Sequence, residues 1–462
     1  MIAKLLVLAF LLASIGVVVL AIAGSIRYGS LEDFVLRVRA EIAARRPHPA
    51  LVPTPIAYDA QGATATRWPA PSLPMPTRPV ATTRPVETTR SVATTQPVAG
   101  ATQTAVVPPK STPSCTSVSP EKPSTPSPTG TATPTLTPVP IHQPARASVE
   151  LIGLTHMWQT WNNCGPATLA MHLSYFGIQL GQADVAAGMR PNREDKNVGP
   201  EELAAFARTQ GLEALVRVNG DADRLGLFLS NGLPVMIRSW VEEEPGEGLG
   251  HYRLLTGYDD ARQEWIAYDS FISVGVDPDQ PYQGIRLLYE QTEQWWAVFN
   301  HTYVVIYRAE MEPLVRSILG SDFDDAAMWQ RALESADKKV RQRPEDPFAW
   351  FNLGTDLVAA QAFERAAGAY DQARTIGLPW RMLWYQFGPF EAYYCTGRYK
   401  ELIALARATL DVTEYVEEVH YWLGMGLQAA GDGDGAVRAF RRALTLNPDY
   451  AQAAEALAAL GE

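Results

Sequence analysis

The stretch QTWNNCGPA, residues 159–167, decides the fold of the central part of the chain because it joins a loop to a helix start. A Gly-Pro pair follows Cys164 directly, and proline is favoured in the first turn of a helix, where its missing N–H has no partner to lose. Apolar residues then recur at helical spacing as far as Phe176, and Gly177 is a typical C-terminal stop. The sequence therefore predicts a helix that begins at Cys164.

A cysteine at a helix start is a candidate nucleophile. The unpaired N–H groups and the helix dipole at an N-terminus stabilise a thiolate and lower the cysteine pKa. Gln159 lies five residues earlier, and its side-chain N–H, together with the backbone N–H of Cys164, is a candidate donor to the oxyanion of a tetrahedral intermediate. The alternative is an inert, packed cysteine, which is the common state of a lone buried thiol.

A candidate base opens the strand-like run GHYRLLTGYD, residues 250–259. A turn after this run predicts a hairpin, in which His251 faces the returning strand near Asp269. A carboxylate beside an imidazole fixes its tautomer and directs its other nitrogen towards the thiol, which predicts a Cys164-His251-Asp269 triad. His301 also lies at a strand start and is the rival base, but it lacks a comparable hairpin carboxylate.

The residues around these motifs predict a compact α+β domain over residues 148–310. A second helix is expected over 200–210, after the helix that begins at Cys164. Strand-like runs follow at 213–218, 234–238, 251–258, 264–270 and 303–307.

Taken together, Gln159, the Cys-Gly-Pro-Ala and Gly-His-Tyr motifs and the strand aspartate resemble the bacteriocin-processing peptidase family, whose papain-like enzymes cut leader peptides after double glycine. The resemblance implies a papain-like cysteine peptidase domain. It matches Gln159, Cys164, His251 and Asp269 to the oxyanion, nucleophile, base and orienting positions of the family. Because the chain has no Gly-x-x-x-x-Gly-Lys-Ser/Thr loop of a transporter ATPase, double-glycine specificity is not carried over.

Residues 322–462 read as helical, with signature positions at the period of about 34 residues that is typical of tetratricopeptide repeats. Trp350, Gly354 and Ala366 mark one unit, Gly424 and Ala436 mark another, and 325–344 reads as a leading half-repeat. We therefore predict an all-α repeat solenoid. Its concave surface is a candidate docking site for a peptide or partner protein, and a purely structural tail is the alternative.

The N-terminal part predicts attachment to a membrane. Residues 1–28 contain an apolar run from Leu5 to Ala23 that is long enough to span a bilayer, which favours a retained anchor over a cleaved signal peptide. Residues 29–46 predict a short juxtamembrane helix. Residues 47–147 are rich in Pro, Thr and Ser and predict a disordered linker. Such a stalk favours an extracytoplasmic domain, although the arginines after the span favour the opposite orientation.

Composition narrows the classes of partner. The net charge of -11 argues against nucleic acid, because nucleic-acid binders usually present a clustered basic face. The chain has three cysteines, with no CxxC or Cys/His spacing, so no disulfide framework and no metal site are expected.

These observations lead to the hypothesis of a membrane-anchored, single-pass, extracytoplasmic cysteine peptidase that needs no cofactor and cuts a peptide or protein. It would be secreted if the N-terminal segment is cleaved. Two alternatives stay open: a non-catalytic peptide-binding scaffold, and a papain-like enzyme that transfers the acyl group to an amine.

Overall fold

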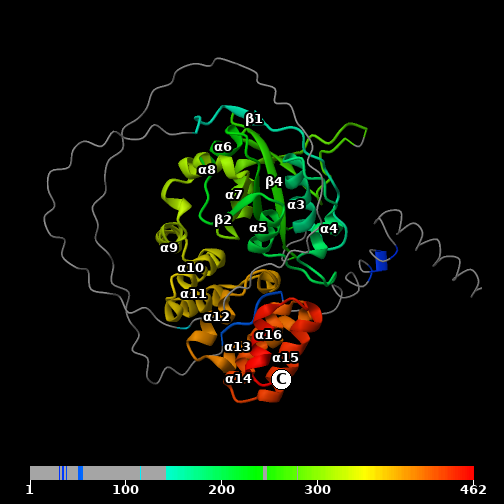
Figure 1. Ribbon diagram of the computed structural model, residues 1–462. Coiled ribbons are helices and arrows are strands. Elements are labelled where there is room, and N and C mark those ends of the chain that lie inside the picture. The colour runs from blue at the N-terminus through cyan, green and yellow to red at the C-terminus, as the bar shows by residue number, and fades with distance from the viewer. Residues whose placement is uncertain are drawn as a thin grey trace, which may run out of the picture. The chain divides into compact units, whose positions relative to one another are not determined.

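The computed structural model describes residues 50–55, 115, 142–242, 247–277 and 279–462, with Leu31, Phe34, Val35 and Val38 (Figure 1). The predicted membrane span at 1–28 lies outside the described residues, as do most of the predicted juxtamembrane helix and linker. The four residues described between 31 and 38 are helical. Among the described helices, none combines the length and apolarity that crossing a bilayer requires.

A seven-stranded antiparallel sheet organises the first folded region, an α+β domain. Strands β2, β7, β3, β4, β5 and β6 are neighbours in that order, and β1 pairs with the far end of β4. The strands are β1 Ser148–Glu150, β2 Glu213–Arg217, β3 Val235–Val241, β4 Leu249–Asp259, β5 Glu264–Tyr268, β6 Ile285–Leu288 and β7 Tyr303–Tyr307. Sequence patterns predicted β2, β3, β4, β5 and β7 close to these bounds, and they did not predict the short β1 and β6.

Helices cover both faces of this sheet, which explains why β3 and β7 are buried along their whole length. Side chains of α3 and α5 form one core with alternate strand residues, and side chains of α6 and α8 form a second core with the others. The helices are α3 Cys164–Tyr175, α4 Gln182–Ala187, α5 Pro200–Thr209, α6 Ala222–Ser230, α7 Tyr289–Ala297 and α8 Glu312–Leu319.

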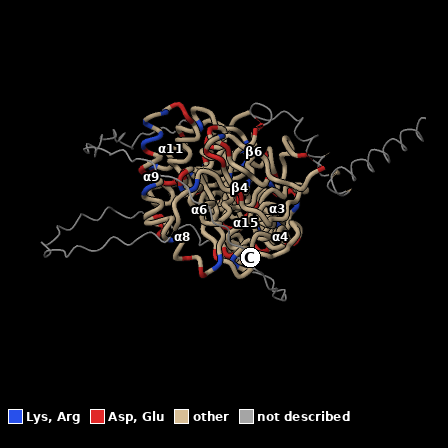
Figure 2. Tube along the Cα trace, turned by 90° about the horizontal axis from the view of Figure 1, so that it is seen from above, with Lys and Arg blue, Asp and Glu red and all other residues tan. Residues whose placement is uncertain are grey.

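The second region is helical and contains paired helices, as the repeat pattern predicts. Its helices are α9 Asp325–Gln342, α10 Pro347–Ala359, α11 Phe363–Ile376, η3 Trp380–Trp384, α12 Gly388–Cys395, α13 Tyr399–Val412, α14 Glu417–Ala429, α15 Gly433–Leu446 and α16 Ala451–Ala459. In two of the pairs a glycine allows close approach: a Cβ on Gly354 of α10 would lie 2.6 Å from the Tyr370 ring of α11, and one on Gly424 of α14 would lie 2.5 Å from the Phe440 ring of α15. Figure 2 shows acidic residues beside the basic residues of α9 and α11.

The two regions share a buried apolar cluster. Trp240 at the end of β3 and Phe299 after α7 belong to the same cluster as the core of the helical region. Hydrogen bonds at its edge join Asn300 Nδ2 to Asp356 Oδ1 at 2.6 Å, and Asn352 Nδ2 to the carbonyl oxygen of Ala297 at 2.7 Å. The helical region therefore packs directly against the loop that connects α7 to β7.

Residues 50–55, which fall within the predicted linker, also contact the helical region. Val52 is only 4% exposed, and its N–H donates to the carbonyl oxygen of Leu378 at 2.9 Å. The Arg374 guanidinium donates to the carbonyl oxygens of Pro53 and Thr54 at 2.8 and 3.2 Å. The sequence patterns did not predict this contact, because six extended residues with two prolines carry no periodic signal of their own.

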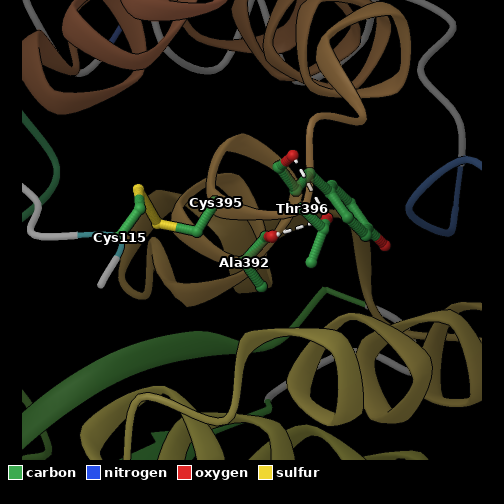
Figure 3. Close-up of a disulfide and its surroundings, with 5 residues drawn as sticks. Cys115, Ala392, Cys395 and Thr396 are labelled. Carbon is green, nitrogen blue, oxygen red and sulfur yellow. Dashed lines mark hydrogen bonds between the residues drawn. A yellow bond between two sulfur atoms is a disulfide. The ribbon is translucent and has the colours of Figure 1, made fainter. Parts of the chain in front are cut away.

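A disulfide joins Cys115 to Cys395 at the end of α12 (Figure 3). The expectation that no disulfide is present is therefore wrong. Two cysteines that are 280 residues apart share no local spacing pattern, so their pairing depends on tertiary structure. Beside the disulfide, the hydroxyl of Thr396 donates to the carbonyl oxygen of Ala392 at 2.8 Å.

Candidate active site

Cys164 is the first residue of α3 and is a half-buried free thiol. The helix starts here because Asn163 takes up a non-helical conformation while its carbonyl oxygen accepts from the Ala167 N–H at 2.8 Å. The buried guanidinium of Arg190 donates to the Asn163 side chain and to the carbonyl oxygen of Asp195 at 3.0 Å. These contacts hold the helix start against the loop before α5.

His251 and Asp269 meet beside this helix start. His251 is the third residue of β4, and Asp269 follows the last residue of β5. The two strands pair up to Leu254 and Tyr268, and Nε2 of His251 lies 3.0 Å from Oδ1 of Asp269. Since Nε2 faces the carboxylate, Nδ1 is the ring nitrogen that remains for an interaction with Cys164, and His251 and Cys164 each shift the pKa of the other.

Several further donors hold the Asp269 carboxylate, which is completely buried. Oδ1 accepts from the backbone N–H groups of Phe271 and Ile272, both at 2.8 Å. Oδ2 accepts from Nε of Arg253 at 2.9 Å, and the Arg253 guanidinium also donates to the Ser239 hydroxyl at 2.6 Å. Hydrogen bonds to both carboxylate oxygens thus fix the orientation of Asp269.

The charges in this group favour a thiolate paired with an imidazolium. Burial lowers the pKa of His251, but the Asp269 carboxylate outweighs burial and raises that pKa to about 9. Burial raises the pKa of Cys164, yet its hydrogen bond with His251 and the nearby N–H groups of Tyr252 and Gly165 bring that pKa below its ordinary value. Burial also raises the pKa of Asp269, while His251 and Arg253 bring it well below the usual range.

Gln159 lies against the residue that follows Asp269. Its N–H donates to the Ser270 carbonyl oxygen at 2.8 Å, and its side-chain Oε1 accepts from the Ser270 hydroxyl at 2.9 Å. With Oε1 engaged in this way, the amide Nε2 has no hydrogen-bond partner among the described residues. An amide held by its oxygen presents its N–H donors in a defined direction, as an oxyanion donor requires.

The other histidines of this region have different surroundings. His301, the rival base, has Nε2 at 2.7 Å from Glu293 and Nδ1 at 3.2 Å from the Lys339 ammonium. His156 contacts the carbonyl oxygen of Asp269 at 2.8 Å and stacks on Tyr282. His172 is fully buried within α3, and burial lowers its pKa to about 3. Of these histidines, His251 is the one that lowers the pKa of Cys164.

Sequence reasoning missed Arg190 and Arg253. Arg253 had a usable signal, because residues two apart on a strand share a face, so His251 and Arg253 had to point to the same side of β4. A buried arginine on that side needs an acid, and Asp269 is the predicted acid nearby. Arg190 had no such signal, since its partners are mostly backbone carbonyls of a loop.

Family models match both folded regions. The model of the Peptidase_C39 like family matches residues 151–302, and the Tetratricopeptide repeat model matches residues 417–450. No curated protein matches the chain.

Several solved structures are similar to parts of the chain. A putative C39-like peptidase from Bacillus anthracis is 16% identical, with 35% of this chain and 98% of that chain covered and a TM-score of 0.27. The peptidase domain of Streptococcus ComA, a bifunctional ABC transporter involved in a quorum-sensing pathway, is 17% identical. The match covers 34% of this chain and 99% of that chain, with a TM-score of 0.25. YrrB, a tetratricopeptide-repeat protein with an unusual peptide-binding site, is 18% identical. The match covers 32% of this chain and 75% of that chain, with a TM-score of 0.26.

Proposed function

We propose that this chain, in which residues 151–302 form a peptidase C39-like domain that is followed by tetratricopeptide repeats, is a cysteine peptidase that hydrolyses peptide bonds. The observation that carries the proposal is the 3.0 Å contact between buried His251 and buried Asp269, beside a cysteine whose pKa the same His251 lowers. A nucleophile, a base and an orienting carboxylate in this order form the functional unit of thiol hydrolases.

In the first step the Cys164 thiolate attacks the carbonyl carbon of the scissile peptide bond. The carbonyl oxygen becomes an oxyanion, and the Gln159 amide and the Cys164 backbone N–H are the proposed donors to it. The proton on His251 passes to the departing amine as the C–N bond breaks. An acyl group then remains on the sulfur as a thioester.

In the second step water replaces the amine. Neutral His251 takes a proton from the water molecule as its oxygen attacks the thioester carbon. The C–S bond breaks, the carboxylic acid leaves, and the sulfur and imidazole return to the ion pair. Asp269 keeps the imidazole oriented in both steps and stabilises its charged form, while Arg253 acts through Asp269 as a positioning residue.

Active-site labelling of the full chain tests this proposal. A peptide epoxide should label wild-type protein at Cys164, and Cys164→Ala should abolish both labelling and peptide cleavage. Cleavage that survives in Cys164→Ala would overturn the proposal. An unreactive thiol in folded wild-type protein would favour the scaffold alternative, and products joined to an added amine would favour acyl transfer.

The proposal extends to location, with residues 1–28 as a membrane anchor and the peptidase domain outside the cytoplasm. The Cys115–Cys395 disulfide supports this placement, because disulfides form and persist mainly in oxidising compartments. In cells that express the full chain, a membrane-impermeant protease should digest the folded region without lysis. Protection until lysis would contradict the proposed orientation.

We also propose that the repeats dock a substrate or partner protein in an extended conformation. Support comes from residues 50–55, which bind to the helical region through main-chain hydrogen bonds to Leu378 and Arg374. Backbone contacts of this kind suit an extended chain of varied sequence. Crosslinking from a photoreactive residue at exposed positions of α13 or α15 should capture the same polypeptide that the peptidase cleaves. The Cys164→Ala variant should capture it equally well, because docking does not need the thiol. If no cleaved polypeptide is captured, docking by the repeats is contradicted.

A further inference from the structure

The helical region has a site for an extended chain where α11 ends and η3 begins. The N–H of Val52 donates to the carbonyl oxygen of Leu378 at 2.9 Å, and the N–H of Trp380 donates to the carbonyl oxygen of Ala50 at 3.2 Å. The two segments run antiparallel at this point. Residues 50–55 are therefore bound through main-chain groups, as a strand added to an exposed edge would be.

Arg374 of α11 supplies the other half of this site. Its side chain is only 3% exposed, and Nη1 donates to Oε1 of Glu401 and to the Tyr393 hydroxyl, both at 2.7 Å. The remaining nitrogens, Nε and Nη2, donate to the carbonyl oxygens of Pro53 and Thr54 at 2.8 and 3.2 Å. Glu401 and Tyr393 thus hold a buried guanidinium with two of its nitrogens directed at main-chain carbonyls, which any extended chain supplies.

One side chain of the bound segment is selected by the site. Val52 is 4% exposed and belongs to the apolar cluster of the helical region, whereas the neighbouring Leu51 is 49% exposed. Proline follows Val52, and a residue before proline is restricted to extended conformations. Such a segment loses little chain freedom when it binds. The ligand that fits is therefore an extended segment with a small aliphatic residue directly before a proline.

The connectivity of the chain keeps this segment near the site. Further along the sequence, Cys115 is bonded to Cys395 at the end of α12, the helix that follows η3. A ligand that is tethered close to its site competes at an effective concentration on the order of millimolar. A separate polypeptide with the same contacts must reach a comparable concentration, or bind more tightly, before it displaces residues 50–55.

We propose that this site of α11 and η3 binds an extended polypeptide with a small aliphatic residue before a proline, and that residues 50–55 occupy it as a resident ligand that excludes others. The inference rests on the docking function proposed above for the helical region, and it names the site, the ligand and the regulation. A partner binds there only after residues 50–55 leave, because both need the main-chain groups of Leu378 and Trp380 and the guanidinium of Arg374.

A fluorescent peptide that copies residues 50–55, with blocked ends, measures access to the site by fluorescence anisotropy. The full-length Val52→Asp variant should bind it at least about tenfold more tightly than wild type, because a buried aspartate disfavours docking of the resident segment and frees the site. Val274→Asp is the matched control and should bind as wild type does, since Val274 is 83% exposed in the peptidase domain. A peptide with the same Val52→Asp change should bind none of these proteins.

Equal affinity of the peptide for wild-type and Val52→Asp protein would overturn the inference, as would a folded Val52→Asp protein that does not bind it. If Val52→Asp does not fold, hydrogen exchange of wild-type protein decides. The N–H groups of residues 50–55 should exchange well before those of α11, and excess peptide should speed their exchange. Exchange of residues 50–55 only on global unfolding would make them a fixed part of the fold. A wild-type dimer that the peptide dissociates would overturn occupation within one chain.

Crosslinking from α13 or α15, repeated on the Val52→Asp variant, separates this inference from the proposed docking function. If Val52→Asp gains peptide binding and both proteins fail to capture a cleaved polypeptide, the resident ligand stands and docking of a substrate fails. If both proteins capture the polypeptide equally and Val52→Asp gains no peptide binding, docking stands and the resident ligand fails. If Val52→Asp gains peptide binding and also captures more of the polypeptide than wild type does, both stand.

Discussion

His251 Nε2 lies 3.0 Å from Asp269 Oδ1 in a site where both side chains are buried, so the charge on each depends on the other. The carboxylate keeps its charge because His251, Arg253 and two backbone N–H groups surround it. The imidazole keeps its proton to unusually high pH because the carboxylate is there. Removing the negative charge should thus change the whole pH dependence of the site.

Asp269→Asn is expected to narrow the pH range of peptide hydrolysis from both sides. The pKa of His251, about 9 in wild-type protein, falls when the carboxylate charge is lost, so the alkaline limb moves to lower pH. The pKa of Cys164 rises because a neutral imidazole no longer stabilises the thiolate, so the acid limb moves to higher pH. We expect hydrolysis at the optimum to fall by about 10²- to 10⁴-fold.

The pH dependence of iodoacetamide labelling at Cys164 measures the acid limb directly, and peptide hydrolysis measures the alkaline limb. Asp260→Asn is the matched control, because Asp260 is an exposed carboxylate on the β4–β5 turn. A profile of Asp269→Asn that coincides with wild type at both limbs would show that Asp269 does not set the charge of His251.

Gln159→Ala is expected to weaken stabilisation of the oxyanion without changing the reactivity of the thiolate. The amide is held by Ser270 and takes no part in the hydrogen bonds of His251 and Asp269. Loss of one oxyanion donor should reduce peptide hydrolysis by about 10²- to 10³-fold, whereas the rate of iodoacetamide labelling should stay near that of wild type. Gln179→Ala, which changes an exposed glutamine, is the control. Equal loss of labelling and hydrolysis would indicate that Gln159 supports the thiolate instead.

The parts of the site that the sequence predicts are those that local patterns specify. The Gly-Pro pair after Cys164 sets a helix start, and the alternation and turn after His251 set a hairpin that returns near Asp269. The structure places these elements as expected and brings His251 and Asp269 together.

The features that sequence reasoning missed depend on contacts between distant elements. Tyr385, which follows η3, lines the same pocket as Cys164 because the helical region packs on Trp240 and Phe299, and no periodicity near Tyr385 indicates this packing. The Cys115–Cys395 pair and the contact of residues 50–55 likewise join segments that are far apart in the chain. Such contacts depend on how two regions pack against each other, and local patterns in a single sequence do not predict that packing.

The Cys115–Cys395 disulfide is expected to stabilise the folded region. Cys395→Ser should lower the free energy of unfolding by about 2–4 kcal/mol, because a cross-link restricts the unfolded chain. Cys115→Ser should have the same effect, and the double variant should lose no more than either one, since all three remove the same bond. Chemical denaturation without reducing agent measures the differences. In unreduced wild-type protein, alkylation of Cys115 or Cys395 detected by mass spectrometry would contradict the pairing.

Asp356 should make the contact between the two regions sensitive to pH. It is fully buried, Oδ1 accepts from Asn300 at 2.6 Å, and Oδ2 has no hydrogen-bond partner among the described residues. Burial raises its pKa to about 8, whereas an aspartate in an unfolded chain titrates near about 4. A carboxyl with a raised pKa binds a proton on folding, so its contribution to stability is greatest below about pH 4 and declines as pH rises to about 8.

Asp356→Asn keeps an oxygen for Asn300 and removes the charge. The variant should be more stable than wild type at pH 8 by an amount on the order of a few kcal/mol, and this advantage should shrink as pH falls towards 5. Thermal unfolding midpoints at several pH values measure the difference, and Asp411→Asn at an exposed position of α13 is the control. A destabilisation of Asp356→Asn that is the same at every pH would contradict a raised pKa of Asp356.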